Sequence, residues 1–233
     1  MAVLRAFETD DYCPDYGIMI LADTSQAWDP GEDPQIPHHR DRGDMPTGAF
    51  AGSGAGWIAA QADGLSDHTV RLELHDVSPP AERADADDVL ETPFRSSSGE
   101  LTLTTVTGGY GEADLLLGDT EWFRVRVARR PAGGARYHWL IQFWPDPVSE
   151  PPVWFARSSE TGDQLAGVAG DIEALLRWTP RLPLETSIDD LARRLLVSSS
   201  AVGEALVVAE KEGLLHLAGD DPLRISLGRR TSS

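Results

Sequence analysis

The chain has 233 residues with 38 acidic and 20 basic side chains, which gives a formal net charge of −18. Hydrophobic residues make up 41% of it, enough to bury a core, so a disordered chain is excluded. The single cysteine, Cys13, excludes an internal disulfide framework and metal sites built from several cysteines. A field of this sign repels nucleic-acid backbones and anionic membranes and attracts a basic partner.

The N-terminal segment 1–11 carries three acids and no apolar signal-peptide core. The apolar stretch 17–22 is too short to cross a bilayer. We therefore expect a cytoplasmic protein with no membrane contact. Arginine outnumbers lysine by 19 to 1, and Ala, Gly and Asp are frequent, which is typical of bacterial genes of high G+C content.

The first two thirds of the chain are predicted to form strands. Turn residues separate these runs and no helical pattern lies between them, which argues against parallel β-α-β units. We expect an antiparallel β-sandwich with loops at 23–55 and 78–88. Apolar and polar residues alternate at 69–75, 101–106, 121–128 and 137–144, with shorter apolar runs at 16–22 and 153–156.

After residue 158 the apolar residues recur at helical spacing. They predict a first helix that ends before Pro180. A second helix begins at the N-cap Ser187, which acidic residues follow in the first turn. A third, capped by Ser199 or Ser200, follows after a short turn.

A β-hairpin is predicted next, from runs 214–218 and 223–227. Three helices and a hairpin in the segment IDDLARRLLVSSSAVGEALVVAEKEGLLHLAGDDPLRISL resemble a winged helix-turn-helix. We therefore predict an α+β protein of two domains, an antiparallel β-sandwich at 1–157 and a winged helix at 158–233.

In winged helices the third helix usually enters the major groove of DNA. Here its start offers Ser198, Ser199 and Ser200 but no Arg, Asn or Gln for a bidentate base contact. The helix carries three glutamates and only one basic residue, Lys211, which disfavours binding to phosphates. The basic residues nearby that are candidates to hold a DNA backbone or a partner are Arg193, Arg194, Arg224, Arg229 and Arg230.

The third helix is apolar on more than one side, because Val207 and Val208 widen its apolar stripe. This indicates a second packing surface, against the N-terminal domain, a partner protein or a second copy in a homodimer. Contact with DNA, contact with protein and a purely structural role all remain open for this domain.

The sandwich region has a further pattern. Pro93-Phe94 precedes a hairpin that turns at Gly99, and Leu117-Gly118-Asp119 leads into the next strand. Over residues 5–145 this resembles the competence-nuclease inhibitor family (of the Nin and ComJ type), small β-sandwich proteins. The resemblance implies a non-enzymatic protein that binds and blocks a DNA-entry nuclease. That family has no appended winged helix.

Histidines and acids outside these patterns suggest little chemistry. His38 and His39 lie beside Asp41 and Asp44, but adjacent histidines on an extended chain point to opposite faces, so a solvated loop is the simpler interpretation. A hydrolase built on this pair is the third and weakest hypothesis.

Asp23 and the acids that follow it lack the spacing of an EF-hand, so at most an adventitious calcium ion is expected there. The acids around Cys13 disfavour a thiolate. The glycine-rich stretch 48–57 lacks the Lys-Ser/Thr pair of a phosphate-binding loop. Besides Asp23, the acidic residues considered as calcium ligands are Asp29, Glu32 and Asp33.

We therefore predict a non-enzymatic regulatory or adaptor protein without catalytic residues, metal or cofactor. Its sandwich is expected to bind a partner, and its winged helix to contact DNA or protein. The alternative is a nuclease-inhibitor or immunity-type protein. Residues 1–157 hold 26 acids and 12 bases, a charge of −14, and would then bind a basic enzyme.

Overall fold

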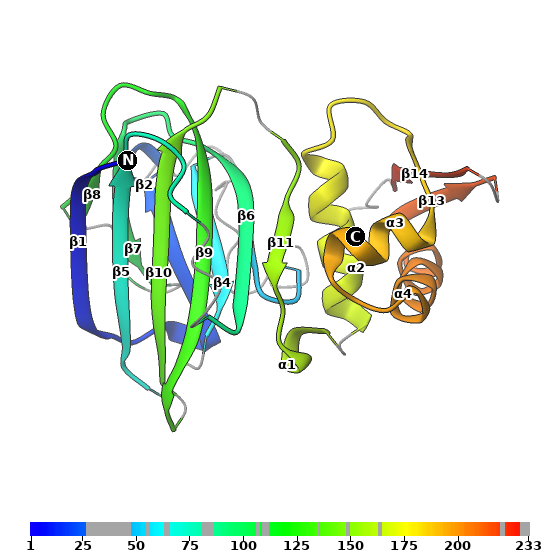
Figure 1. Ribbon diagram of the computed structural model, residues 1–233, viewed down its shortest axis with the longest axis horizontal. Coiled ribbons are helices and arrows are strands. Elements are labelled where there is room, and N and C mark those ends of the chain that lie inside the picture. The colour runs from blue at the N-terminus through cyan, green and yellow to red at the C-terminus, as the bar shows by residue number, and fades with distance from the viewer. Residues whose placement is uncertain are drawn as a thin grey trace.

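The protein is an α+β structure with its two large β-sheets at one end and its helices with a small sheet at the other (Figure 1). It is described here from a computed structural model. No helix among the described residues is both long and apolar enough to span a membrane. The residues that the structure describes are 1–26, 48–54, 56–62, 66–80, 86–105, 108, 112–134, 136–147, 150–162, 165–219 and 222–228.

Two sheets are packed face to face to form a sandwich (Figure 1). The six-stranded sheet has the order β1 (Val3–Tyr12), β5 (His68–His75), β10 (Arg136–Pro145), β9 (Trp122–Gly133), β6 (Asp88–Arg95) and β11 (Val153–Ala156). The second sheet has the order β3 (Ala51–Gly54), β4 (Trp57–Gln61), β2 (Ile18–Asp23), β7 (Glu100–Thr104) and β8 (Leu115–Leu116).

The prediction of an antiparallel sandwich was wrong at one pairing, because β5 and β10 run parallel from Thr69↔His138 to Leu74↔Phe143. Parallel neighbours need a long crossover. Here β6 to β9 supply it, so strands rather than a helix separate the parallel pair. The predicted loops also ended too late, since β3 and the start of β6 lie within them.

The core of the sandwich follows the period-2 alternation of its strands. On β10, Trp139, Ile141 and Phe143 are buried between the sheets. Phe50, just before β3, stacks on Trp139 with ring centroids 5.7 Å apart and planes 3° from parallel. Each such ring removed from water stabilises the fold by about 1.5–3 kcal/mol.

The C-terminal residues form the three predicted helices and the hairpin, together with a short helix, α1, and a strand, β12, that were not predicted. The small sheet is antiparallel in the order β12-β14-β13, and α2 packs on α4. The elements are α1 (Ser159–Gly162), α2 (Leu165–Arg177), β12 (Leu184–Thr186), α3 (Ile188–Leu195), α4 (Ser199–Lys211), β13 (Leu215–Ala218) and β14 (Leu223–Leu227).

Candidate partner-contact surface

Helices α3 and α4 are joined by a tight turn, and a serine side chain caps the start of each helix. Ser187 caps α3 by accepting a hydrogen bond from the Asp190 N–H at 3.1 Å, as the sequence predicted. Leu196 ends α3 in the left-handed conformation, with φ 54°. Ser198, rather than Ser199 or Ser200, caps α4.

The three serines predicted as contact residues all bond to neighbouring groups. Ser198 accepts from the Ala201 N–H at 3.1 Å, and the Ser199 hydroxyl donates to Asp189 at 2.6 Å. The Ser200 hydroxyl donates to Glu204 at 3.1 Å. These hydroxyl groups therefore fix the start of α4.

Two of the predicted arginines form ion pairs with neighbouring carboxylates. Arg193 bonds to Asp190 at 2.9 Å, one turn earlier on α3. Arg224 on β14 lies 3.0 Å from Glu185 on β12. Both pairs are exposed, so the pairing neutralises charge but adds little stability.

Arg194 points away from α4 toward the sandwich. It donates to the backbone carbonyls of Pro151 and Pro152, each at 3.4 Å. Burial lowers its pKa, and Glu150 acts in the opposite direction. Lys211 is exposed in the last turn of α4. Arg193 and Arg194 are neighbours on α3, whereas Arg224 lies on β14 and Lys211 on α4. Arg229 and Arg230 lie outside the described residues.

The exposed face of α4 has one large apolar side chain, Val207, among small, polar and charged residues. Val207 is 65% exposed. Glu204 and Lys211 are exposed one turn before and after it, and Ser200 is exposed two turns before it. At Gly203 an added Cβ would meet no atom within 4 Å. This face and the β13–β14 hairpin lie at the end of the molecule away from the large sheets (Figure 1).

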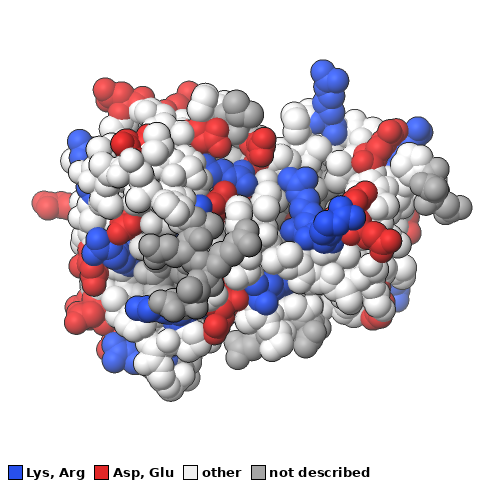
Figure 2. All heavy atoms as spheres, viewed as in Figure 1, with Lys and Arg blue, Asp and Glu red and all other residues white. Residues whose placement is uncertain are grey.

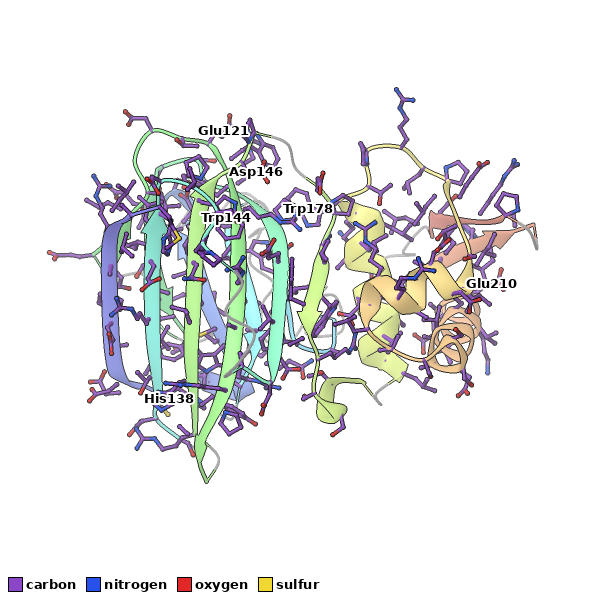
Figure 3. The ribbon with its side chains drawn as sticks, viewed as in Figure 1. Glu121, His138, Trp144, Asp146, Trp178 and Glu210 are labelled. Carbon is purple, nitrogen blue, oxygen red and sulfur yellow. The ribbon has the colours of Figure 1, made fainter. Side chains whose placement is uncertain are left out.

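The opposite side of the helical part rests closely on the sandwich. Two glycines of α2 allow the contact: a Cβ on Gly167 would lie 2.7 Å from the Cβ of Ala49, and one on Gly170 would lie 3.0 Å from the Gly48 Cα. Beyond α2, Trp178 points toward the sheets (Figure 3), where it meets Trp122 edge to face at 6.1 Å.

Buried charges also cross this contact. Arg157, just after β11, lies 2.9 Å from Asp171 of α2, and both side chains are almost fully buried. Arg157 further donates to the Leu195 carbonyl at 2.9 Å and lies 4.3 Å from the ring centroid of Trp154. Burial raises the pKa of Asp171 to about 7, although Arg157 and the Ala49 N–H stabilise its charge.

A second buried pair holds α1. Asp88 at the start of β6 accepts from Arg129 at 2.5 Å, from the Ser158 N–H at 2.9 Å and from the Thr161 hydroxyl at 2.7 Å. Arg129 also lies 4.6 Å from the ring centroid of Tyr137. The helical part is thus fixed to the sandwich at two places, at α1 through Asp88 of β6 and at α2 through Arg157.

The outer face of the six-stranded sheet carries a row of polar residues that bond to each other. Glu91 accepts from Arg126 at 2.7 Å, and Arg126 donates to Gln142 at 3.3 Å. Gln142 donates to Glu73 at 2.9 Å, and Glu73 lies 2.9 Å from His75. Arg126 also donates to the Pro79 and Pro80 carbonyls, so this row anchors the segment after β5.

Acidic side chains are exposed where β1 ends and β5 begins. Asp10, Asp11 and Asp67 are exposed there. They lie together because Tyr12 pairs with His68. Close by in sequence, Tyr16 is 55% exposed with the unusual backbone angles φ 55° and ψ 21°. Figure 2 shows acidic atoms around the edge of the sandwich and a gathering of basic atoms over α3.

Asp23 does not offer its oxygens to a cation. It is buried and accepts from the Ser25 hydroxyl at 2.5 Å, the Ser96 hydroxyl at 2.5 Å, the Ser97 N–H at 2.7 Å and the Ser98 hydroxyl at 2.6 Å. Burial opposes its ionisation, but these hydrogen bonds lower its pKa to about 2.

The other candidates for chemistry give no cluster to build on. Cys13 is exposed. Within the described ranges no group of three His, Cys, Asp or Glu side chains is placed to hold a metal ion. The predicted histidine and acidic loop residues outside the described ranges are Asp29, Glu32, Asp33, His38, His39, Asp41 and Asp44.

The buried ion pairs of the junction were not predicted from the sequence. One signal was present: Asp171 falls on the apolar stripe of α2, between Val168 and Leu175, where a solvated carboxylate does not belong. Its partner Arg157 and the Asp88–Arg129 pair give no local pattern, because their partners are 14 and 41 residues away.

No protein-family model matches this chain, and no curated protein matches it in sequence. Two solved structures are similar to part of it. One is ComJ from Bacillus subtilis, an inhibitor of the DNA-degrading activity of NucA, with 10% identity, a TM-score of 0.41, and cover of 62% of this chain and 98% of that one. The other is the product of crocagin biosynthetic gene J, with 17% identity, a TM-score of 0.44, and cover of 63% and 99%.

Proposed function

We propose that this chain is a non-enzymatic adaptor: a β-sandwich at 1–157 that carries a winged helix at 158–233 and contacts a protein partner through α4. The observation that carries the proposal is the exposed face of α4. It is apolar at Val207, open at Gly203 and acidic at Glu204. An exposed apolar side chain between a small residue and an acid suits a protein surface better than a phosphate backbone.

The basic residues of this part of the chain argue the same way. Arg193 and Arg224 are each paired with an acid, and Arg194 is turned toward the sandwich. DNA affinity depends on unpaired cations that replace the counterions of phosphates. In the described residues of α4, only Lys211 has such a charge, against Glu204 and Glu210 on the same helix.

A photo-crosslinking amino acid at Val207 tests the proposal in cells that express the full chain. We expect one discrete protein adduct from position 207. None is expected from Leu116, a matched position on β8 that is 45% exposed. Glu204→Arg should remove the adduct. An adduct between two copies would identify the partner as a second copy, whereas a DNA adduct or identical adducts from both positions would contradict the proposal.

A second candidate function is inhibition of a basic enzyme by the sandwich. The specific observation is the exposed group of Asp10, Asp11 and Asp67, with the exposed Tyr16 close by in sequence. Tyrosine is frequent among residues that dominate binding energy, and acids around it favour a basic partner. The same activity is implied by the resemblance of residues 5–145 to the competence-nuclease inhibitors.

Plasmid protection against basic non-specific DNA nucleases tests this candidate with the full chain. Protection should be lost in D10N/D11N/D67N. It should persist in E112Q/D119N/E212Q, which changes net charge equally at exposed acids elsewhere. Equal protection by both triple variants, or no protection by the unaltered chain, would rule this candidate out.

A further inference from the structure

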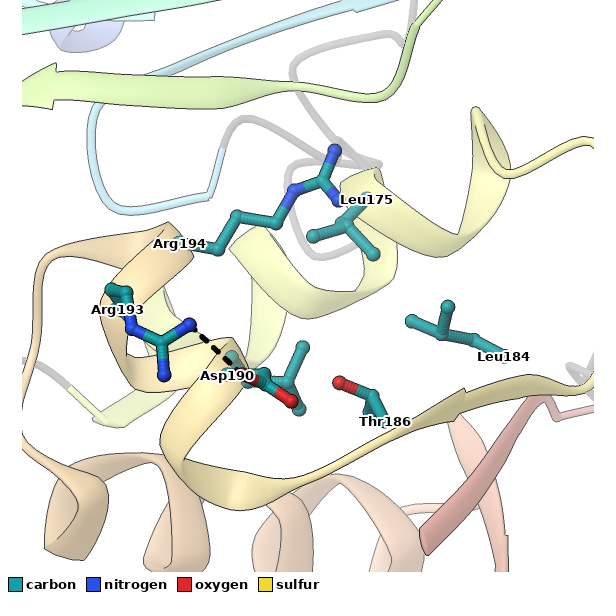
Figure 4. A pocket seen from close by; sticks show the side chains of 7 residues that line it. Leu175, Leu184, Thr186, Asp190, Arg193 and Arg194 are labelled. Atoms are coloured by element: carbon teal, nitrogen blue, oxygen red, sulfur yellow. Dashed lines mark hydrogen bonds and ion pairs between the residues drawn. The ribbon is translucent and has the colours of Figure 1, made fainter. Parts of the chain in front are cut away.

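The helical part contains a pocket of about 280 Å³ between α2, β12 and α3 (Figure 4). Its apolar lining comes from Leu175 and Leu191, which are buried, and from Leu184, which is partly exposed. Liquid water fills roughly 30 Å³ per molecule, so the space equals about nine waters. It therefore fits a ligand of about ten non-hydrogen atoms.

The charged residues of the pocket are not balanced. Asp190 is engaged by Arg193 at 2.9 Å, which leaves that pair neutral (Figure 4). Arg194 has only two neutral acceptors, the carbonyls of Pro151 and Pro152, both at the long distance of 3.4 Å. No carboxylate of the described residues forms an ion pair with Arg194. Glu150 stabilises the charge of Arg194 only from beyond ion-pair distance. Among the described residues, the guanidinium at the edge of the pocket therefore has no directly bonded anion.

We propose that this pocket binds a small monocarboxylic acid with an apolar body. The body would contact Leu175, Leu184 and Leu191, and the carboxylate would pair with Arg194. A partly buried guanidinium whose present acceptors are neutral and distant gains most from an anionic partner, because charge-assisted bonds are about twice as strong as neutral ones. The site depends on the pocket alone and not on the proposed function of α4.

Titration calorimetry of the full chain with phenylacetate tests the site. Phenylacetate has ten non-hydrogen atoms, an apolar ring and one carboxylate. We expect saturable binding that is at least about tenfold weaker for 2-phenylethanol, which keeps the body without the charge, and absent for 2-phenylethylammonium. No saturable binding of phenylacetate up to about 10 mM, or equal binding of the alcohol, would overturn the proposal.

Two arginine variants provide the matched comparison. Arg194→Gln should weaken phenylacetate binding at least about tenfold. Arg177→Gln should leave it unchanged, because Arg177 lies on α2 outside the pocket and pairs with Glu173. Leu184→Trp fills the pocket and leaves Arg194 in place, so it should abolish phenylacetate binding. This variant tests the site if Arg194→Gln does not fold. Binding that survives Leu184→Trp would place the ligand elsewhere.

Discussion

The guanidinium of Arg157 lies 2.9 Å from the carboxylate of Asp171, and the two side chains are 1% and 4% exposed. The pair joins the residue after the last strand of the sandwich to the middle of α2. Such pairs give little net stability but fix geometry, because each charge is costly without the other. The exposed face of α4 is consequently held in one orientation relative to the sandwich.

Two glycine-to-alanine changes should act in opposite directions. Alanine is favoured over glycine inside a helix by about 1 kcal/mol. Gly203→Ala should therefore stabilise the protein, because no atom lies within 4 Å of the added Cβ. Gly167→Ala should destabilise it by roughly 1–3 kcal/mol, because its Cβ would overlap the backbone of Ala49. Urea unfolding midpoints measure both, and stabilisation by Gly167→Ala would show that the contact with Ala49 is not tight.

The pKa of Asp171 predicts a stability change between mild acid and neutrality. Burial raises this pKa from 3.8 to about 7, so the folded protein binds a proton there that the unfolded chain releases. The stabilisation that this bound proton provides is fully present below pH 4 and is lost as the pH rises through 7. Relative to Asp171→Asn, which cannot ionise, the unaltered chain should lose stability over this range. Parallel pH profiles from urea unfolding would contradict the raised pKa of Asp171.

Asp23 should have the opposite dependence. Its serine hydrogen bonds lower the pKa from 3.8 to about 2, so its contribution is present above pH 4 and disappears as the pH falls through 2. The shift corresponds to roughly 2 kcal/mol at neutral pH. Asp23→Asn should lower the free energy of unfolding by about that amount at pH 7 and by much less at pH 2. The exposed Asp119→Asn serves as control, and an equal loss in both variants would exclude the hydrogen-bonded network as the cause.

Strands with a clear period were predictable from the sequence, whereas β6, which has no such period, was not. The run that became β10 places Trp139, Ile141 and Phe143 at alternate positions on its inner face. Strand β6 does not alternate, since Asp88, Glu91 and Thr92 are all buried with partners on other strands. The parallel pairing of β5 with β10 depends on contacts about 69 residues apart, which no local pattern records.

The candidate site shows the same limit. The starts of α3 and α4 follow from local residue types. The cap of α3 was predicted correctly at Ser187, and the cap of α4 was placed one or two residues too late. Whether an arginine there is available for DNA depends on its neighbours in space. Glu185 on β12 neutralises Arg224 on the neighbouring strand β14. Arg194 points away from α4 because it donates to the Pro151 carbonyl. Neither partner is recognisable before the chain is folded.

Fluorescence anisotropy of a labelled random duplex with the full chain tests the protein-contact proposal most directly. At about 50 mM salt, where phosphate-driven binding is strong, we expect no binding. The control E185Q/D190N releases Arg224 and Arg193 from their acids and should bind weakly, with affinity that falls at about 200 mM salt. Salt-dependent binding by the unaltered chain, lost in R193A/R224A, would contradict the proposal and identify the winged helix as a DNA reader.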